Sequence, residues 1–483
     1  MNLKELLADI ELLSLTGSDA VKITALGFDS RAAAPGMLFA ALRGEHSDGH
    51  DYIGAAVEKG VSAILCETLP ETLAEGVTCV QVPDSRRALG LIASAFYGHP
   101  SRNLALVGVT GTNGKTTTAT LLYDLFRKLG YRAGLISTVV YKVDDKTYPA
   151  THTTPDPIRI NELMARMVDT GCDYCFMEVS SHSIVQCRTA GLTFRGGIFS
   201  NITHDHLDYH GTFAEYIKAK KRFFDELPKE AFALVNIDDK NGRVMVQNTK
   251  AGIRTYSLKS ASDLKCKIIE TLPEGMLLNI DGREIWVKFL GGFNAYNLLA
   301  VYASAVLLGA RPDEVLMALS RLEPVNGRFQ TLRSATGVTA VVDYAHTPDA
   351  LSNVLATIQE ILPGDKKLYT VVGCGGNRDR TKRPVMARVA VENSSLAILT
   401  SDNPRKEKPE DILADMTAGL AAGTRCLTVV DRREAIRAAI LTAAPGDIVL
   451  VAGKGHEDYQ IIGETKYHFD DKEEVLNCFA VLK

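Results

Sequence analysis

The sequence predicts an α/β fold of three domains, with a central sheet built around a Gly-rich turn and a doubly wound sheet near the C-terminus. Short apolar segments typical of strands alternate with helical segments, and four strands near the C-terminus are each followed by a polar loop. The length of 483 residues corresponds to about three domains. Turns near 99–101 and 324–330 place the expected domains at 1–101, 102–331 and 332–483.

The composition is that of an ordinary globular protein, with 46% apolar and 23% charged residues. A net charge of -4 without a basic block argues against nucleic acid or an anionic membrane as a partner. The longest uncharged apolar run, 298–310, is too short to cross a bilayer. The N-terminal segment MNLKELLADIELL reads as an amphipathic helix and lacks the organisation of a signal peptide. We therefore expect a cytoplasmic protein.

The cysteines do not form a recognisable framework. There are nine of them, and an odd total argues against a set of disulfides. One CxxC is present, Cys172 and Cys175, without a second pair at zinc-site spacing. We interpret this pair as strand packing, with reduced thiols.

Residues 1–101 read as a small α/β unit. Four segments have the apolar character of strands, expected at 23–28, 37–42, 62–66 and 78–82. Two segments have helical periodicity, 51–59 and 86–97. Considered alone, the polar segments 28–31 and 44–50 are most simply turns.

The central domain begins with the stretch LALVGVTGTNGKTTT at 104–118, followed by a helical pattern to Gly130. Glycines let backbone N–H groups close around phosphate oxygens, Lys115 supplies charge, and the Thr116 hydroxyl can ligate magnesium. The strict G-x-x-x-x-G-K-[ST] spacing would need a glycine at Val109, so this is a variant. The stretch predicts a phosphate loop for a nucleoside triphosphate.

Two further strands of the central domain end in polar residues. The segment 173–179 brings Glu178 to its carboxyl end, and 195–201 leads into a His- and Asp-rich loop at 203–210. Ligands of open α/β sheets lie outside the carboxyl ends of the strands, so these loops should converge on the phosphate loop. Glu178 and His206 are therefore candidate magnesium ligands.

The rest of the central domain contains three recognisable segments. The helix 213–224 carries Lys218, Lys220, Lys221 and Arg222, which composition alone indicates to be a solvated basic face. The segment 277–289 predicts a β-hairpin that turns at Asp281 and Gly282. Asn294 and Asn297 share one face of a helix that runs to Leu308.

The third domain repeats one pattern four times, a strand and then a polar loop. The strands are expected at 338–342, 368–372, 396–400 and 448–452, and the loops at 343–348, 373–380, 402–405 and 453–457. Helical segments between them indicate a doubly wound, Rossmann-like sheet with the loops along one edge. The GCGG turn lacks the full G-x-G-x-x-G of a dinucleotide site, so a second substrate site is the better interpretation.

Taken in order, these motifs resemble the Mur ligases, ATP-dependent peptide-bond-forming enzymes of bacterial cell-wall precursor synthesis. The resemblance covers all three domains and rests on GTNGKTT at 111–117, EVSSH at 178–182, HDHLDYHG at 204–211, the two Asn residues, GRF at 327–329, DYAHTPD at 343–349, DNPR at 402–405 and GKGHE at 453–457. The resemblance is strongest for family members that add diaminopimelate to UDP-N-acetylmuramoyl-L-alanyl-D-glutamate. In that reaction ATP phosphorylates the D-glutamate side-chain carboxylate, and an amino group attacks the acyl phosphate.

The resemblance implies roles around ATP. Lys115 would neutralise the transferring phosphoryl group, with Thr116, Glu178 and His206 around Mg²⁺. Lys220 matches a lysine that the family carries as a carbamate, so the resemblance revises the solvated-face interpretation of its helix. The implied ATP-binding residues are Gly111, Thr112, Asn113, Gly114, Lys115, Thr116, Thr117, Asn294, Asn297, Arg328 and Asp343.

It also implies two substrate sites. The residues for the UDP-sugar dipeptide are Phe28, Ser30, Glu45, His46, Ser47, Thr153, Thr154, Ser180, Gln186 and Arg188, with His152 where some relatives have Asn. Those for diaminopimelate are Arg378, Asp402, Asn403, Pro404, Arg405, Gly453 and Glu457. An Arg fork such as Arg405 pairs bidentately with a carboxylate, and relatives that add lysine lack an Arg there. Arg405 does not distinguish meso- from LL-diaminopimelate.

Other assignments stay open at this point. A lysine-adding or folylpolyglutamate-type ligase is the nearest alternative, and a phosphate-loop kinase or nucleotide-switched binding module is an alternative of another class. The expected partners are small molecules, namely ATP, the UDP-sugar dipeptide and diaminopimelate, and we expect a monomer. We also expect the third domain to swing about 324–332, so that closure assembles the site.

Overall fold

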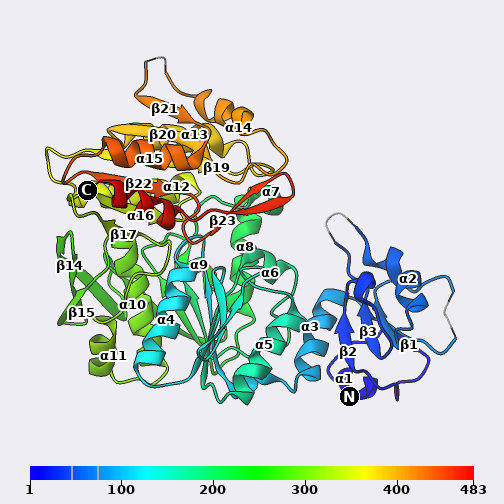
Figure 1. The fold of residues 1–483 in the computed structure, drawn as a ribbon. Helices are drawn as coiled ribbons and strands as arrows, with labels where there is room; N and C mark the ends of the chain where they lie inside the picture. Colours follow the sequence, from blue (N-terminus) through cyan, green and yellow to red (C-terminus); the bar gives the residue numbers. More distant parts are fainter. Residues whose placement is uncertain (45–46, 73–74, 422, 483) are drawn as a thin grey trace.

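The computed structural model describes residues 1–44, 47–72, 75–421 and 423–482. Figure 1 shows three bodies, each with its own large sheet: the N-terminal residues lie to one side of the central residues, and the C-terminal residues lie above them. The α/β class predicted from the sequence is confirmed. In the described part of the chain, no helix combines the length and apolar character needed to span a membrane.

The N-terminal body is a five-stranded sheet in the order β1-β5-β4-β3-β2, parallel except for β1. Its strands are β1 (Ser14–Thr16), β2 (Ala25–Gly27), β3 (Met37–Ala40), β4 (Ala63–Cys66) and β5 (Thr78–Gln81). Its helices are α1 (Leu3–Leu6), α2 (Ile53–Glu58) and α3 (Ser85–Phe96), with 3-10 turns η1 (Ser30–Ala32), η2 (Gly49–Tyr52) and η3 (Pro100–Asn103). The apolar side chains of α1 and α3 bury one face of the sheet, and those of α2 bury the other.

The N-terminal helix is shorter than the sequence predicts. Leu3 and Leu6 are buried in the core, whereas Leu12 and Leu13 are exposed. The backbone N–H of Leu13 donates to Gln81 O at 2.8 Å, at the edge of the sheet. The chain leaves the helix because a backbone that extends along β5 finds partners in the sheet and only the first turn has a core to face.

The central body is an eleven-stranded sheet in the order β16-β15-β14-β13-β12-β11-β6-β10-β7-β8-β9. The strands from β7 to β14 in this order are parallel, and both ends of the sheet are antiparallel. They are β6 (Ala105–Thr110), β7 (Ala133–Ile136), β8 (Val140–Val143), β9 (Lys146–Pro149), β10 (Tyr174–Glu178), β11 (Gly196–Phe199), β12 (Phe232–Asn236), β13 (Gly252–Ser257), β14 (Leu264–Leu272), β15 (Gly275–Ile280) and β16 (Arg283–Val287). The predicted hairpin is confirmed as β15 and β16, with Asp281 and Gly282 both at positive φ.

Helices cover both faces of this sheet. They are α4 (Lys115–Lys128), α5 (Pro157–Asp169), α6 (Ser181–Val185), α7 (Leu207–His210), α8 (Phe213–Asp225), α9 (Gly242–Met245), α10 (Gly292–Leu307) and α11 (Pro312–Leu319). One core contains the apolar residues of α4 and α10, and another contains those of α5 and α8. Cys172 and Cys175 are free and buried, Cys175 in β10 and Cys172 just before it, which agrees with their interpretation as packing residues.

The C-terminal body is a six-stranded sheet in the order β17-β18-β22-β19-β20-β21, parallel except for β17. Its strands are β17 (Gln330–Arg333), β18 (Thr339–Asp343), β19 (Leu368–Cys374), β20 (Leu396–Ser401), β21 (Cys426–Val429) and β22 (Ile448–Ala452), and a separate hairpin is formed by β23 (Tyr459–Ile462) and β24 (Thr465–His468). The helices are α12 (Pro348–Ile361), α13 (Lys382–Glu392), α14 (Pro409–Thr417), α15 (Arg432–Thr442) and α16 (Asp471–Val481). Since α12 to α14 cover one face and α15 and α16 the other, the predicted doubly wound arrangement is confirmed. The domain boundaries stay predictions, and β17 already begins at Gln330.

Candidate active site

One large cavity lies where the carboxyl ends of the central strands face those of the C-terminal sheet. It has a volume of about 1630 Å³. Among the residues predicted from the sequence, it is lined by Thr112, Asn113, Gly114, Lys115, Thr116, Thr117, Thr153, Thr154, Glu178, Ser180, Arg188, His206, Lys220, Asn294, Asn297, Arg328, Asp343, Arg378, Asp402, Asn403, Arg405, Gly453 and Glu457. Groups from the central and C-terminal bodies, far apart in the sequence, therefore meet in one space, as the positions of their strand ends predicted.

The phosphate loop is held in a conformation that needs its glycines. Gly111 and Gly114 have φ of 154° and 85°, and a Cβ at Gly111 would lie 1.9 Å from Ser200 Oγ. At Gly114 it would lie 2.5 Å from Asn297 Oδ1. The loop is thus a close-fitting cradle that leads directly into the N-terminus of α4, where backbone N–H groups favour an anion.

Lys115 lies folded back onto this loop. Its Nζ donates to Gly111 O at 2.9 Å and to Thr112 O at 2.7 Å. Burial lowers its pKa, although Glu178 and Asp205 oppose that shift. The ammonium is therefore placed at the cradle. A bound phosphate would compete with the two backbone carbonyls for it.

Glu178 lies buried at the end of β10 and is held by a residue that the sequence did not single out. Thr138 donates its backbone N–H to Glu178 Oε1 at 2.7 Å, and the Thr138 hydroxyl is 3.2 Å from Oε2. The same hydroxyl is 3.1 Å from Thr153 Oγ1. Thr154 Oγ1 donates to Glu178 O at 2.7 Å and accepts from Ser180 N at 3.1 Å. The position of Thr138 just after β7 was the signal that could have found it.

His206 stands at the rim of the cavity on a strained backbone. Its φ is 54°, in the left-handed region, and its Nε2 lies 3.5 Å from Asp205 Oδ2. Burial lowers the pKa of His206 to about 4, with Lys115 and Lys220 adding to the shift and Asp205 opposing it. The imidazole is thus neutral at neutral pH, the form that can donate a lone pair to a metal.

Lys220 is buried, so the solvated-face interpretation from composition is wrong for it. The residue is 1% exposed, whereas the Lys218 side chain on the same helix is 77% exposed. Lys220 Nζ donates to Gly111 O at 2.8 Å and lies 4.8 Å from the centre of the Tyr216 ring. Burial, and then the charge of Lys115, hold its pKa well below the usual value. The helical period places Lys220 on the inward face with Tyr216 and Phe224.

The wall of the cavity beside α10 contains two interlocked Asn residues. Asn297 Nδ2 donates to Asn294 Oδ1 at 3.3 Å, and Asn294 Nδ2 donates to Leu290 O at 2.9 Å. Asn297 Oδ1 accepts from Thr118 Oγ1 at 3.4 Å, so α10 is tied to α4. Tyr296, which the sequence did not single out, lines the same wall and donates to Asp238 Oδ2 at 2.7 Å.

Arg328 connects the C-terminal body to the phosphate loop, and Asp343 holds the backbone beside it. Arg328 Nη2 donates to Thr116 Oγ1 at 3.0 Å, and its guanidinium stacks 4.5 Å from the centre of the Tyr344 ring. The Asp343 carboxylate accepts from the backbone N–H groups of Phe329 and Ala345, both at 2.7 Å. Burial raises the pKa of Asp343, with Arg328 opposing.

The C-terminal side of the cavity gathers charges of both signs. Asn403 Nδ2 donates to Glu457 Oε2 at 2.8 Å, and the fully buried Lys454 donates to Asn403 Oδ1 at 3.1 Å. Burial, and then Asp402, raise the pKa of Glu457. The sequence did not single out Lys454, although its place between two glycines after β22 was a signal. This cluster can receive an ammonium group between carboxylates.

The other residues of that side lie around Arg405. Arg405 Nη1 donates to Gly376 O at 2.9 Å, and Arg378 Nη1 donates to the adjacent Asn377 O at 3.3 Å. Gly453, with φ of 118°, packs against Asp402. A Cβ at Gly453 would lie only 2.8 Å from Asp402 Oδ2.

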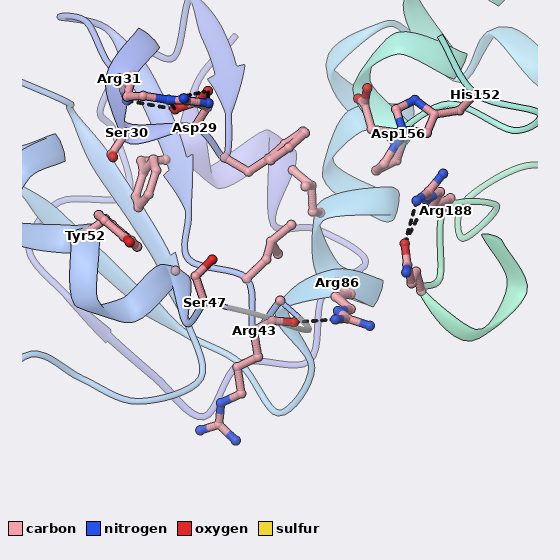
Figure 2. Close-up of a pocket in the computed structure, with 18 residues that line it drawn as sticks. Asp29, Ser30, Arg31, Arg43, Ser47, Tyr52, Arg86, His152, Asp156 and Arg188 are labelled. Carbon is pink, nitrogen blue, oxygen red and sulfur yellow. Dashed lines mark hydrogen bonds and ion pairs between the residues drawn. The ribbon is translucent and has the colours of Figure 1, made fainter. Parts of the chain in front are cut away.

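A second cavity, of about 700 Å³, lies between the N-terminal and central bodies. Figure 2 shows Ser30, Ser47 and Tyr52 on one side and His152, Asp156 and Arg188 on the other. The lining also includes Phe28 and Gln186, and the predicted residues Glu45 and His46 lie outside the described residues. The sequence did not single out Arg31, Arg43, Tyr52, Arg86 or Asp156, which add mostly cationic groups.

Arg188 connects the two cavities, because it lines both of them, as does His152. Its guanidinium donates to Gln186 Oε1 at 2.6 and 3.0 Å and to Thr154 O at 2.6 Å. A long substrate lying along both cavities would pass this group. The arrangement can therefore hold an extended anionic molecule at one end, a triphosphate in the middle and a zwitterion at the other end.

Comparisons with known proteins match all three bodies. Family models described as "Mur ligase family, catalytic domain", "Mur ligase middle domain" and "Mur ligase, glutamate ligase domain" match residues 22–97, 109–305 and 327–455. The chain is 57% identical over 483 residues to the UDP-N-acetylmuramoyl-L-alanyl-D-glutamate--2,6-diaminopimelate ligase of Bacteroides fragilis, with 100% of both chains covered. It is 58% identical over 475 residues to the enzyme of the same name from Cytophaga hutchinsonii, with 98% of both chains covered.

Solved structures give the same result. A structure of a UDP-N-acetylmuramoyl-L-alanyl-D-glutamate--2,6-diaminopimelate ligase has a TM-score of 0.71 and 32% identity, covering 100% of this chain and 99% of that one. A MurF ligase of Thermotoga maritima in complex with ADP has a TM-score of 0.63 at 18% identity, covering 95% and 97%. The second likeness concerns the fold alone.

Proposed function

Because the chain belongs to the Mur ligase family, we propose that it is an ATP-dependent, ADP-forming ligase that joins diaminopimelate to UDP-N-acetylmuramoyl-L-alanyl-D-glutamate in peptidoglycan precursor synthesis. The observation that carries the proposal is that the phosphate loop, Arg188 and Arg405 line one cavity. They supply, in turn, a cradle for a triphosphate, a cation beside the cavity of the N-terminal body, and a fork for a carboxylate.

The proposed reaction has two steps. An oxygen of the D-glutamate side-chain carboxylate attacks the γ-phosphorus of ATP, and ADP leaves. The amino nitrogen of the diamino acid, after it loses a proton, attacks the acyl carbon, the C–N bond forms and inorganic phosphate leaves. Lys115 and the backbone N–H groups at the start of α4 provide positive charge where negative charge develops on the transferred group.

The residues around the loop fit ATP with magnesium. The cradle at Gly111 and Gly114 has no room for a Cβ, which suits close approach of phosphate oxygens to the backbone. Thr116, Glu178 and His206 line the same cavity and would hold Mg²⁺, which neutralises phosphate charge when it is bound. Among the described residues, no three His, Cys, Asp or Glu side chains form a metal cage. Magnesium needs no such cage, because it is commonly bound through one or two carboxylates and substrate phosphates.

Lys220 is proposed to carry a carbamate. A carbamate forms when a neutral amine attacks CO₂ and releases a proton, and the lowered pKa of Lys220 favours the neutral amine. The modified side chain would place an anion beside Gly111 and near Lys115, where it could orient the ammonium and the metal. An unmodified charged lysine would be costly at a fully buried position.

The diamino acid is proposed to lie between Arg405 and the acidic pair Asp402 and Glu457. The Arg405 fork would bind the distal carboxylate, and the acidic pair would bind the distal ammonium. A lysine-adding ligase has no distal carboxylate for the Arg405 fork, and a folylpolyglutamate-type ligase has no UDP-sugar dipeptide to occupy the cavity of the N-terminal body. A phosphate-loop kinase or a nucleotide-switched binding module would leave the whole Arg405 side of the cavity without a role.

A cytoplasmic location, a monomeric state and the absence of nucleic-acid and membrane partners stay predictions. The small, nucleotide-linked substrate supports the location. Analytical ultracentrifugation of the purified chain at several concentrations measures the oligomeric state.

The direct test measures ADP release with every combination of ATP, dipeptide nucleotide, meso- or LL-diaminopimelate and lysine. We expect release only when the dipeptide nucleotide and a diaminopimelate isomer are both present. Lys115→Ala should abolish it, while Lys128→Ala, on the exposed end of the same helix, should not. Equal rates with lysine and diaminopimelate, or release without the dipeptide nucleotide, would contradict the proposal.

A further inference from the structure

A buried arginine joins two loops behind the C-terminal side of the cavity. Arg383, in α13, has a side chain that is 0% exposed, and its guanidinium donates to both carboxylate oxygens of Glu407 at 2.9 Å. It also donates to Gly375 O at 3.3 Å and to Asp415 Oδ2 at 2.7 Å. Neither Arg383 nor Glu407 is among the described residues that line the cavity, so the pair acts from behind its wall.

Glu407 holds the turn at 375–377 against the loop at 402–407. Its Oε1 accepts the backbone N–H of Asn377, whose Oδ1 accepts from Lys406 N at 3.0 Å. Gly376 N donates to Asn403 O at 2.9 Å, and a Cβ at Gly376 would lie 1.9 Å from Pro404 O. The two loops touch along their backbones and form one unit.

This unit determines where the Arg405 guanidinium points. Arg405 Nη1 is fixed on Gly376 O, which belongs to the opposite loop. Asn377 and Arg405 have φ of 52° and 53°, in the left-handed region that side chains disfavour. Such conformations persist only where the surroundings hold them, and the Arg383–Glu407 pair joins both loops at this point.

We propose that Arg383 and Glu407 are positioning residues that set the selectivity for a distal carboxylate on the incoming amino acid, by fixing the Arg405 fork. The inference rests on the proposed function. Bidentate pairing needs the plane of the guanidinium aligned with the carboxylate, so a small tilt of the loop weakens it. An amino acid without that carboxylate gains nothing from the alignment. Arg383 and Glu407 therefore control the selectivity between amino acids with and without a distal carboxylate.

The chain offers a matched control for this pair. Asp415, in α14, also binds Arg383, but the described partners of its carboxylate are Arg380 and Arg383, both in or next to α13. Asp415→Asn therefore removes a carboxylate charge beside Arg383 and leaves the loop-to-loop contact of Glu407 in place. Glu407→Gln removes the charge at the loop contact itself.

The experiment compares the full-length wild type, Glu407→Gln and Asp415→Asn. For each, kcat and KM are measured for diaminopimelate, lysine and ATP, together with the thermal midpoint of unfolding. We expect Glu407→Gln to raise KM for diaminopimelate about ten-fold, the equivalent of one charge-assisted hydrogen bond. The ratio of kcat/KM for diaminopimelate to that for lysine should fall by the same factor, with KM for ATP unchanged. Asp415→Asn should leave the ratio at the wild-type value.

Equal effects of the two substitutions on the ratio, or a fall in kcat with unchanged KM for diaminopimelate, would overturn the inference. If Glu407→Gln does not fold, Arg383→Lys, which keeps the charge but loses the fork, provides the same comparison, and an unchanged ratio would again overturn it. Wild-type enzyme that does not use diaminopimelate would overturn the proposed function. Normal wild-type activity with an unchanged ratio in the variants would overturn only the positioning role.

Discussion

The carboxylate of Asp349 accepts a hydrogen bond from the side chain of Asn113 at 3.2 Å. Asn113 belongs to the phosphate loop, and Asp349 lies in the first turn of α12, in the C-terminal sheet domain. The same Oδ2 accepts from Thr203 Oγ1 at 3.2 Å, in the loop after β11. One carboxylate therefore connects the C-terminal body to two loops of the central body.

Asp349→Asn should weaken the coupling between the nucleotide side and the C-terminal domain. An amide at this position has one acceptor oxygen and brings its own donors toward Asn113 and Thr203. We expect kcat/KM for ADP release to fall about ten-fold, the equivalent of one hydrogen bond to a charged group. Binding of the dipeptide nucleotide alone, measured by calorimetry, should not change, because Asp349 is not among the described residues that line the cavity of the N-terminal body.

The matched control is Asp365→Asn, at a largely exposed side chain in the same domain. Small-angle scattering with and without an ATP analogue and the dipeptide nucleotide tests the predicted swing about 324–332. If wild type and Asp349→Asn gave identical profiles in both conditions, the coupling role would be refuted.

Replacing Lys220 by Ala should lower kcat by about 100-fold or more, because a preorganised charged group beside the phosphate loop is lost. Lys218→Ala, on the exposed face of the same helix, should have no effect. Intact-protein mass and activity are measured with and without added bicarbonate. We expect activity to fall on removal of CO₂ and to recover when bicarbonate is added back, more fully as pH rises toward 8, since formation of a carbamate consumes CO₂ and the neutral amine and releases a proton.

An unmodified mass together with activity that does not respond to CO₂ would refute the carbamate on Lys220. The loss of activity in Lys220→Ala would then have to come from the bond to Gly111 O.

Arg405→Ala should raise KM for diaminopimelate by about 10- to 100-fold, as expected for loss of a bidentate bond to a carboxylate. KM for ATP should change less than two-fold, which corresponds to about 0.4 kcal/mol, because Arg405 belongs to the loop after β20 and not to the phosphate loop. Lys406→Ala is the neighbouring control, with a side chain that is exposed and paired with Glu464. Equal increases in both KM values would exclude the assigned role of Arg405.

Gly90→Ala should disturb the contact between the N-terminal and central bodies. A Cβ at Gly90, in α3, would lie 2.8 Å from both Ala190 Cβ and Ala190 O. Overpacking of this kind costs about 1–3 kcal/mol, more than the roughly 1 kcal/mol that Ala gains over Gly in a helix. We expect a lower unfolding midpoint and a higher KM for the dipeptide nucleotide, since α3 also carries Arg86 of the second cavity.

Gly54→Ala, in α2, is the opposite case. No atom outside its own helix lies within 4 Å of a Cβ there, so the substitution should stabilise the protein by up to about 1 kcal/mol. If the unfolding midpoint rose in both variants, the contact at Gly90 would accommodate the added methyl group without loss of stability.

Much of the site was predictable because it follows strand ends. Glu178 ends β10, Asp402 follows β20 directly, and His206 lies in the loop after β11, and carboxyl ends of parallel strands meet at one edge. Thr138 and Asp349 also hold this edge, but the only signal for Thr138 was its position just after β7, and a single Asp in the first turn of a helix carries none. The N-terminal helix was predicted but too long, because its apolar pattern continues to Leu13, whereas the structure pairs the backbone of Leu13 with the edge of the sheet.

The sequence by itself determined the α/β class, the order of strands and polar loops, and the types of chemical group that each loop presents. These depend on patterns that repeat within a few residues. Only the tertiary structure decided that Lys220 is buried beside Lys115, that Lys454 lies among carboxylates, and that Arg383 supports the Arg405 loop. Burial and pairing join positions far apart, 109 residues for Lys220 and Gly111 and 236 for Asn113 and Asp349. A lysine in water and a lysine in a core have the same local pattern and differ in what the rest of the chain places around them.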